Sequence, residues 1–348
     1  MVSINSGIVV EWEKREGNGG TGRSHMNKIR GIIILCALFW AGGCAGKAES
    51  PESGRAADGQ ETEWQETERQ EAEESDSEAG GTSGADVQGE ARDAKIVEAD
   101  WSDAFQGING AGVIYDPAEN RYLIYNEEQA MTRRSPCSTF KIVSAAIALE
   151  NGILDPDHST RPWSGEVFWN AEWNQDMDFE AAFRSSCVWY FREVVDEIGK
   201  ELMQSGLDGL VYGNCDISDW EGRLNTNNDN PALTGFWIES SLKISPREQT
   251  EVMERIFGSH SEYSGKTKEQ LERVMAAPVQ EENGCSVYGK TGMGKAAGVV
   301  VDSWFTGFAD GDGKRVYFCV YLGETQGAEV SSAKAREIAV RIVTDFFG

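Results

Sequence analysis

The chain has 348 residues, of which 40% are hydrophobic, and it carries a formal net charge of −26 with an isoelectric point near 4.5. This acidic excess argues against nucleic acid and anionic lipid surfaces as partners, because both attract lysine and arginine. The chain has only three histidines and no H-E-x-x-H motif, so we predict no metal site. Its length suffices for one large globular domain after the N-terminal segments.

The first 44 residues read as an extension followed by a leader. Residues 1–25 are polar, and we interpret them as a non-native or untranslated extension, with Met26 as the expected start. Residues 26–44 combine a basic segment, an apolar stretch too short to span a bilayer, and small residues before Cys44. This pattern resembles a lipoprotein signal peptide, so we expect export and a lipid anchor on Cys44. The alternative is an ordinary signal peptide in which this cysteine occurs by chance.

Residues 45–98 are acidic and rich in Ser, Gly, Gln and Ala, with almost no large apolar side chains. Such a segment cannot bury enough surface to offset the entropy lost on ordering. We therefore predict a disordered linker here, with a binding tail as the alternative, and a single catalytic domain over residues 99–348.

The domain opens with β-forming residues at 111–115 and 122–125 around a polar turn at 116–120, which predicts a hairpin. A long apolar helix is expected from Pro136 to Gly152. Tryptophans 163, 169 and 173 then lie in an irregular stretch, where they either line a cleft or pack beneath a loop. Helices are expected over 179–198, 236–244 and 246–257, with Ser186 within the first of these or at a break in it.

Three strand candidates follow at 285–290, 302–309 and 315–322, and an amphipathic helix at 331–347 closes the chain. The order of hairpin, helical middle, meander and helix predicts an α+β fold. We expect an antiparallel sheet flanked by helices, plus a separate helical lobe, with the catalytic groups between the lobes.

The chemistry centres on the pattern S-x-x-K, in which a serine and a lysine share one helical face. It occurs three times, at Ser138 and Lys141, Ser240 and Lys243, and Ser331 and Lys334. Only the first pair follows a proline and opens a long apolar helix, whose N-terminal end favours a developing oxyanion. We therefore predict Ser138 as nucleophile and Lys141 as its base.

Further motifs follow that pair in a fixed order: Ser186-Cys187-Val188, Tyr212-Gly213-Asn214, Phe236-Trp237-Ile238-Glu239 and Lys290-Thr291-Gly292. With Ser138-Thr139-Phe140-Lys141, this set resembles the class D serine β-lactamases, over roughly residues 100–348. The stretch from Pro136 is most similar to enzymes of Gram-positive bacteria. The resemblance implies the serine β-lactamase/D,D-peptidase fold and an exported protein, lipid-anchored to the outer face of the cytoplasmic membrane.

The resemblance also implies a mechanism. Lys141 would take up carbon dioxide or bicarbonate, become N-carboxylated and act as general base, with no other cofactor. Phe140, Val188 and Trp237 would form an apolar cage in which the Trp237 indole donates to the carbamate. Ser186 would pass a proton to the leaving lactam nitrogen.

The remaining site residues carried over from the family concern the substrate. Lys290 and Thr291 would hold its carboxylate, Gly292 would let it approach, and the backbone N–H groups of Ser138 and Met293 would form the oxyanion hole. Tyr212, Gly213 and Asn214 are expected to support the cleft structurally. The family's carboxylate-binding arginine is not placed by the sequence, although Lys334 and Arg336 lie in the relevant region.

Two other functions remain open. A penicillin-binding sensor would acylate once and signal, but known sensors tend to have a polar asparagine where Val188 stands. A D,D-transpeptidase shares two motifs, but the Tyr212–Asn214 and Trp237 segments argue against it. The expected partners are β-lactams and, through the anchor, a membrane; no protein partner is predicted. Beyond Cys36 and Cys44, five cysteines remain, an odd number that shows no disulfide framework.

Overall fold

The computed structural model describes residues 94–224, 229–276 and 284–348. The expected extension (1–25), the signal peptide (26–44) with its Cys44 and all of the predicted linker up to residue 93 lie outside these residues. The predicted linker ends too late in the sequence, because strand β1 (Lys95–Glu98) already belongs to the sheet. This strand has only four residues, and three of them are exposed, so its sequence lacks the alternation of buried and exposed residues that would predict a strand. Among the described residues, no helix is both long and apolar enough to cross a bilayer.

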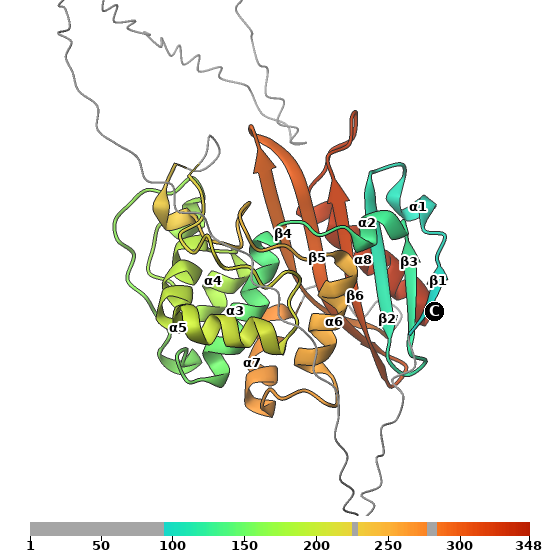
Figure 1. Ribbon diagram of the computed structural model, residues 1–348, viewed down its shortest axis with the longest axis horizontal. Helices are drawn as coiled ribbons and strands as arrows, with labels where there is room; N and C mark the ends of the chain where they lie inside the picture. Colours follow the sequence, from blue (N-terminus) through green and yellow to red (C-terminus); the bar gives the residue numbers. More distant parts are fainter. Residues whose placement is uncertain (1–93, 225–228, 277–283) are drawn as a thin grey trace, which may run out of the picture. The chain divides into compact units, whose positions relative to one another are not determined.

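A six-stranded sheet forms the centre of the domain, in the order β1-β3-β2-β6-β5-β4 (Figure 1). All neighbouring strands are antiparallel except the edge pair β1 and β3, which is parallel. The strands beyond β1 are β2 (Gly110–Asp116), β3 (Arg121–Tyr125), β4 (Ser286–Ala296), β5 (Val299–Gly311) and β6 (Lys314–Gly323). The predicted hairpin and three-stranded meander are confirmed, although β4 and β5 are longer than expected.

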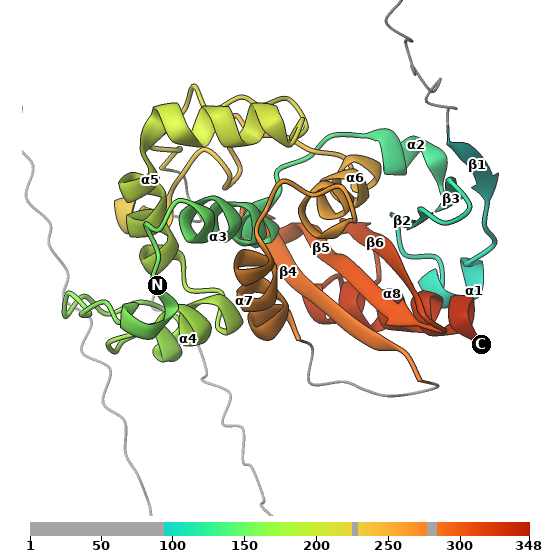
Figure 2. The ribbon, with the colours of Figure 1, turned by 90° about the horizontal axis from the view of Figure 1, so that it is seen from below.

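Helices cover both faces of the sheet and extend past β4 as a separate lobe (Figures 1 and 2). Helix α8 (Ser332–Phe347) packs on one face with α1 (Ser102–Phe105), and α6 (Pro246–Phe257) packs on the other. The other helices are α2 (Glu127–Met131), α3 (Lys141–Glu150), α4 (Phe179–Arg184), α5 (Val188–Gly209) and α7 (Gly265–Met275). The predicted α+β fold with a helical lobe is therefore confirmed.

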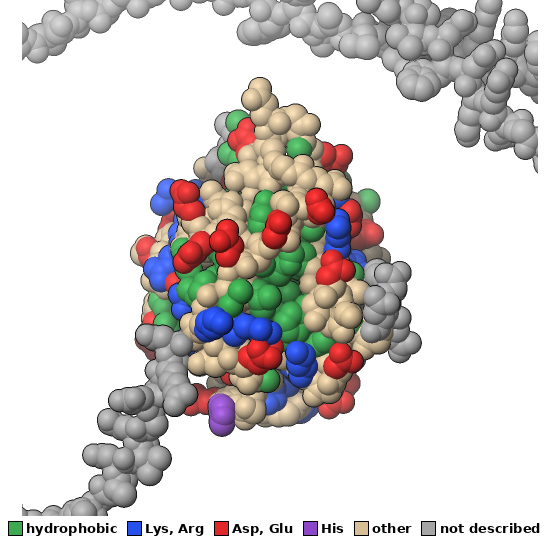
Figure 3. All heavy atoms as spheres, turned by 90° about the vertical axis from the view of Figure 1, so that its right-hand side faces the viewer, with side chains coloured by type: hydrophobic (Ala, Val, Ile, Leu, Met, Phe, Trp, Pro, Cys, Tyr) green, Lys and Arg blue, Asp and Glu red, His purple; other side chains and the backbone are tan. Residues whose placement is uncertain are grey.

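One continuous apolar core joins the helical lobe to the sheet. The ring of Phe257 on α6 lies 4.6 Å from that of Phe308 on β5, which in turn stacks on Tyr288 of β4 at 4.7 Å. Buried aromatic pairs of this kind add to the burial energy of each ring. Strand β4, at the edge of the sheet, is thus held firmly beside the lobe. On the β1 side of the molecule, apolar side chains gather in the centre of the face among charged ones (Figure 3).

One helix prediction was wrong, and for another the structure decides between the two positions expected for Ser186. The segment 236–244 is a loop. Its Trp237 carbonyl accepts from Cys137 N at 3.0 Å, in the turn before Ser138, and Glu239 has a non-helical φ of 51°. The helix expected over 179–198 is broken between α4 and α5. Ser186 has φ of 62° there, and Cys187 N donates to the Ala182 carbonyl at 2.8 Å, which caps α4.

Candidate active site

The proposed nucleophile lies at the point where the helical lobe meets the sheet. Ser138 belongs to a 3₁₀ turn, η1 (Cys137–Phe140), which runs directly into α3. Lys141 Nζ lies 3.0 Å from Ser138 Oγ, within hydrogen-bonding distance. The Lys141 side chain is only 1% exposed, and burial lowers its pKa to about 8. A usable fraction of this amine is therefore neutral near neutral pH, as a base for Ser138 requires.

The other two S-x-x-K pairs have structural surroundings. Ser240 Oγ donates to Asp219 at 2.6 Å, which ties two loops together. Ser331 caps α8 by accepting from Lys334 N, and Lys334 Nζ bonds Glu337 at 2.8 Å. Among the three pairs, only Ser138 and Lys141 are joined by a hydrogen bond between their side chains within the described residues, so Ser138 stays the predicted nucleophile.

A second serine and lysine pair lies in the same site. Lys290, on β4, is 4% exposed and donates to Ser186 Oγ at 2.7 Å and to the Thr291 carbonyl at 3.0 Å. Burial, together with the charge of Lys141, places the pKa of Lys290 well below its usual value. Ser186 can therefore give up its own proton and be reprotonated by Lys290, which is the property needed to protonate a leaving nitrogen.

Gly292 allows β4 to approach the nucleophile's turn. A Cβ added at this position would lie 3.0 Å from the Pro136 carbonyl oxygen and 3.0 Å from Thr139 Cγ2. The missing side chain thus makes room for η1 as well as for any substrate. Ser138 and Met293, the two residues whose N–H groups were expected to bind an oxyanion, line the same cavity of about 480 Å³.

The side chains of Phe140, Val188 and Trp237 are all buried. The ring of Trp237 stacks on that of Phe140, the residue before Lys141, at 5.8 Å. In the described part of the chain, the buried indole nitrogen of Trp237 has no hydrogen-bond partner. Because a buried donor without an acceptor is costly, this N–H fits an added acceptor, such as a carboxylate on Lys141.

The Tyr212-Gly213-Asn214 motif supports this cage from behind. The Tyr212 ring meets Phe140 edge-on at 5.6 Å, with an interplanar angle of 76°. Gly213 has φ of 54°, and a side chain there would collide with the Lys243 carbonyl. Asn214 holds the same loop by accepting from Lys243 N at 2.8 Å and donating to the Ser241 carbonyl at 2.9 Å. All these contacts are structural, in agreement with the expected supporting role.

The cavity beside Ser138 has an aromatic wall and a mostly acidic rim. Trp169 and Trp173 both line it, with exposed fractions of 73% and 3%. Trp163 instead packs against the lobe core. Of the two alternatives for the tryptophans, lining a cleft thus applies to Trp169 and Trp173, and packing applies to Trp163. The charged lining residues are Asp229, Glu239 and Lys295.

Sequence reasoning left two features of the site unassigned. Arg336, on α8, shares with Lys290 and Thr291 the wall of a neighbouring cavity of about 350 Å³, and its buried Nη2 atom has no hydrogen-bond partner among the described residues. Glu239 ties the loop carrying Trp237 to β4, because its carboxylate accepts from Lys295 N at 2.7 Å. The family resemblance left Arg336 and Lys334 only as nearby basic residues, and Glu239 belonged to the Trp237 motif without a predicted role of its own.

The fold and this pair of serine–lysine contacts define a penicillin-binding catalytic domain. The chain belongs to the family of the penicillin binding protein transpeptidase domain, whose model matches residues 110–344. It resembles class D β-lactamases within that family, as the motifs predicted. A crystal structure of a class D β-lactamase from Bacillus subtilis is 27% identical, covers 71% of this chain and 95% of that one, and has a TM-score of 0.60.

Penicillin receptors are equally similar to this chain. The regulatory protein BlaR1 of Bacillus licheniformis is 31% identical over 70% of this chain, which spans 38% of the length of that protein. The solved C-terminal domain of the Bacillus licheniformis BlaR penicillin-receptor is 29% identical, covers 73% of this chain and 97% of that domain, and has a TM-score of 0.63. Similarity alone therefore does not separate a hydrolase from a receptor.

Proposed function

We propose that this protein hydrolyses β-lactam antibiotics through an acyl-enzyme on Ser138. The observation that carries this proposal is the buried Lys141 amine, 3.0 Å from Ser138 Oγ, together with the buried indole N–H of Trp237, which is unpaired among the described residues and whose ring stacks on the neighbouring Phe140. A buried amine of lowered pKa can react with carbon dioxide, and the resulting N-carboxylated lysine supplies the base that a protonated lysine lacks.

Each residue then has a defined part in acylation. Ser138 Oγ loses its proton towards Lys141 and attacks the lactam carbonyl, while the N–H groups of Ser138 and Met293 bind the oxyanion. The C–N bond breaks as Ser186 gives its proton to the nitrogen, and Lys290 reprotonates Ser186. Thr291 and Arg336 would bind the substrate carboxylate, which is supported by the cavity wall that both share with Lys290.

Turnover, rather than a single acylation, is favoured by the apolar surroundings of Lys141. Val188 is 9% exposed and offers no group that could hydrogen-bond to the lysine or compete with Trp237. A stable carbamate is needed a second time, to activate the water that releases the acyl group. The similarity to the BlaR receptor domain supports the second candidate, a sensor whose acyl-enzyme persists.

A steady-state assay with nitrocefin, with and without added bicarbonate, tests the proposal against the second candidate. A hydrolase gives many turnovers, and bicarbonate raises the rate, whereas a sensor gives one equivalent of product and then stops. Mass spectrometry of penicillin-treated protein should place the adduct on Ser138. Ser138→Ala should abolish both signals, whereas Ser331→Ala, which loses only a helix cap, should keep them. An adduct on Ser240 or Ser331 contradicts the assignment.

We also propose that the mature protein is exported and anchored by a lipid on Cys44. The support is the basic segment, short apolar stretch and small residues before this cysteine. Palmitate labelling in a Gram-positive host should depend on Cys44 and be lost in Cys44→Ala. A soluble product cleaved at another position would show that the anchor is wrong without affecting the proposed chemistry.

A further inference from the structure

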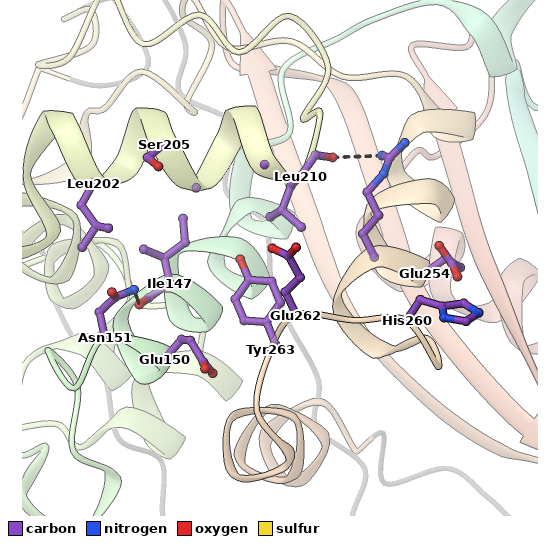
Figure 4. A pocket seen from close by; sticks show the side chains of 13 residues that line it. Ile147, Glu150, Asn151, Leu202, Ser205, Leu210, Glu254, His260, Glu262 and Tyr263 are labelled. Carbon is purple, nitrogen blue, oxygen red and sulfur yellow. Dashed lines mark hydrogen bonds between the residues drawn. The ribbon is translucent and has the colours of Figure 1, made fainter. Parts of the chain in front are cut away.

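A second cavity, of about 490 Å³, lies in the helical lobe and shares no lining residue with the cleft beside Ser138. Its walls come from α3, the last turns of α5, α6 and the segment at residues 260–263 (Figure 4). This volume is typical of sites that hold small organic molecules. Neither the nucleophile nor its lysine contributes to it, so the proposed β-lactam chemistry leaves this cavity unexplained.

Helix α5, which borders the cavity, changes direction along its length. Gly199 has φ of 73° inside the helix, so the residues after it run on a new axis. A Cβ added at Gly206 would lie 2.5 Å from Ile147 Cδ1, which shows that α5 touches α3 there. One turn later, a Cβ added at Gly209 would meet no atom within 4 Å. The two helices thus separate towards Gly209 and leave a space open between them.

Apolar groups from facing elements border this space. Ile147 on α3 faces Leu202 on α5 and Leu210 just after that helix, and the Tyr263 ring lies between them and α6 (Figure 4). Burial raises the pKa of Tyr263 to about 12, and the nearby charges of Glu150 and Glu262 add to that shift. The cavity therefore offers a flat aromatic surface, a neutral phenol and branched aliphatic side chains to the body of a ligand.

The charges of the lining are mostly negative. Glu150, Glu254 and Glu262 all belong to it. The Glu150 carboxylate accepts from Ser264 N at 3.0 Å and from Ser264 Oγ at 2.9 Å, so a ligand would find it already hydrogen-bonded.

The two basic lining side chains do not balance these carboxylates. The Arg255 guanidinium donates to the Leu210 carbonyl at 2.9 Å and lies 3.7 Å from Glu251, outside the lining. His260 is exposed at the rim. Within the described residues, an apolar space thus opens beside carboxylates that no lining cation neutralises.

We propose that this cavity binds small organic cations that carry an ammonium group on an aromatic or branched aliphatic body. The ammonium would lie beside Glu262 and Glu254, where it balances their charge. The body would pack between Ile147, Leu202 and Tyr263. The ammonium would also be attracted to the face of the Tyr263 ring. This assignment rests on shape and charge complementarity and is independent of the proposed hydrolase activity.

Three probes of similar shape and different charge test the proposal on the full 348-residue chain. They are 2-phenylethylamine, which is a cation, 2-phenylethanol, which is neutral, and 3-phenylpropionate, which is an anion. Isothermal titration calorimetry should show the amine binding more tightly than the alcohol by about twofold to fivefold, and the carboxylate weakest. Equal affinity for the three probes contradicts the proposal.

Variants show whether the binding is in this cavity, which matters because an acidic protein attracts cations everywhere. Gly209→Leu places a side chain in the open space without strain, and it should weaken amine binding by about tenfold or more. Glu262→Gln should remove most of the preference for the amine over the alcohol. The matched control is Glu329→Gln, an exposed carboxylate in the loop before α8, which should change neither.

Penicillin acylation of Ser138 reports that each variant is folded, because none of the three positions lies in the catalytic cleft. If Gly209→Leu acylates normally and still binds the amine as tightly as the unaltered chain, the cation binds elsewhere and the site is refuted. If no penicillin acylates even the unaltered chain, the proposed hydrolase activity fails, while the calorimetry still decides the cation site.

Discussion

Lys290 Nζ donates to Ser186 Oγ at 2.7 Å, across the gap between the edge strand β4 and the break that separates α4 from α5. Both residues were expected in the site, but the family resemblance implied that Lys290 holds the substrate carboxylate. The contact is the basis of the role that we propose instead, in which Lys290 orients Ser186 and supplies its proton. Thr291 and Arg336 then remain for the carboxylate, because both line the cavity next to Lys290.

This arrangement predicts that Ser186→Ala slows acylation. Without the hydroxyl, no group lies between Lys290 and the leaving nitrogen, and the loss of general acid catalysis typically costs about 10²–10⁴ in rate. Stopped-flow measurement of acylation by benzylpenicillin checks the effect. The control is Ser185→Ala, since Ser185 Oγ bonds only the Ala181 carbonyl on α4. If both variants acylate at the same rate, Ser186 does not carry the proton.

Replacing Trp237 by phenylalanine should make the enzyme depend on bicarbonate. The ring stays stacked on Phe140, so the packing is largely kept, but the N–H proposed to hold the carbamate is lost. Removing a charge-assisted hydrogen bond of about 1.5–3 kcal/mol weakens carbamate retention by roughly tenfold to a hundredfold. A burst of nitrocefin hydrolysis should then decay to a slow steady state.

Bicarbonate should partly restore that steady state in Trp237→Phe. The comparison is Trp220→Phe, which alters another buried tryptophan of the lobe that stacks on Phe236 at 5.1 Å. This variant should lose stability without gaining a bicarbonate requirement. Unchanged turnover in Trp237→Phe would show that the indole N–H does not hold a carbamate.

The lowered pKa of Lys141 gives the carbamate a definite pH dependence. The folded-state pKa is about 8, against 10.5 for an ordinary lysine, so the neutral amine that reacts with carbon dioxide becomes scarcer as pH falls below about 8. Each pH unit below that point removes about nine-tenths of it. The ¹³C signal of labelled carbamate should therefore decline from about pH 8 to about pH 6, together with activity.

The same shift affects stability in a known direction. Because the folded state disfavours protonated Lys141, the unfolded chain binds more protons between about pH 8 and about pH 10.5, and the free energy of unfolding falls as pH decreases through that range. Denaturant unfolding at several pH values should show this slope, and Lys141→Met should reduce it.

For the carbamate prediction, an active enzyme that gives no carbamate signal at any pH would refute the proposed base.

Much of the architecture followed from local patterns. Alternating β-formers around a polar turn identified the β2–β3 hairpin, and a proline before an apolar run identified the helix that carries Lys141. The loop at 236–244 was mistaken for a helix because its apolar residues are buried by contacts with Ser135–Cys137, a hundred residues away. Long-range hydrogen bonds of this kind leave no periodic trace in the sequence.

The same limit applies to the site. The order of the motifs predicted that Ser138, Lys141, Ser186 and Lys290 share one site. The direction of the Lys290 ammonium, however, depends on the interruption between α4 and α5, where Ser186 has a positive φ. Arg336 was one of two basic residues in the region where the resemblance implies a carboxylate-binding arginine. The structure brings Arg336 to a cavity wall shared with Lys290 and Thr291, whereas Lys334 bonds Glu337.

The charge of the cleft predicts which penicillins are preferred. Beside Ser138, the cavity carries the carboxylates of Asp229 and Glu239, and among the lining residues that the structure describes Lys295 is the one cationic side chain. The exposed Trp169 and Val167 offer an apolar surface to an aromatic side chain. A penicillin with an ammonium next to its phenyl ring should therefore bind better than one with a carboxylate at that position.

Benzylpenicillin, ampicillin and carbenicillin form a suitable series, because their phenyl side chains differ only in a hydrogen, an ammonium or a carboxylate on the same carbon. We expect kcat/KM to fall in the order ampicillin, benzylpenicillin, carbenicillin, with about twofold to fivefold between neighbours, as for exposed charge pairs. Added salt should compress the differences, since the cleft is open to solvent. Asp229→Asn should lower the ratio of ampicillin to carbenicillin, whereas Asp345→Asn, an exposed change on α8, should leave it as it is. A ratio near one in the unaltered enzyme, or a preference for carbenicillin, would show that Lys295 or Arg336 outweighs the acidic rim.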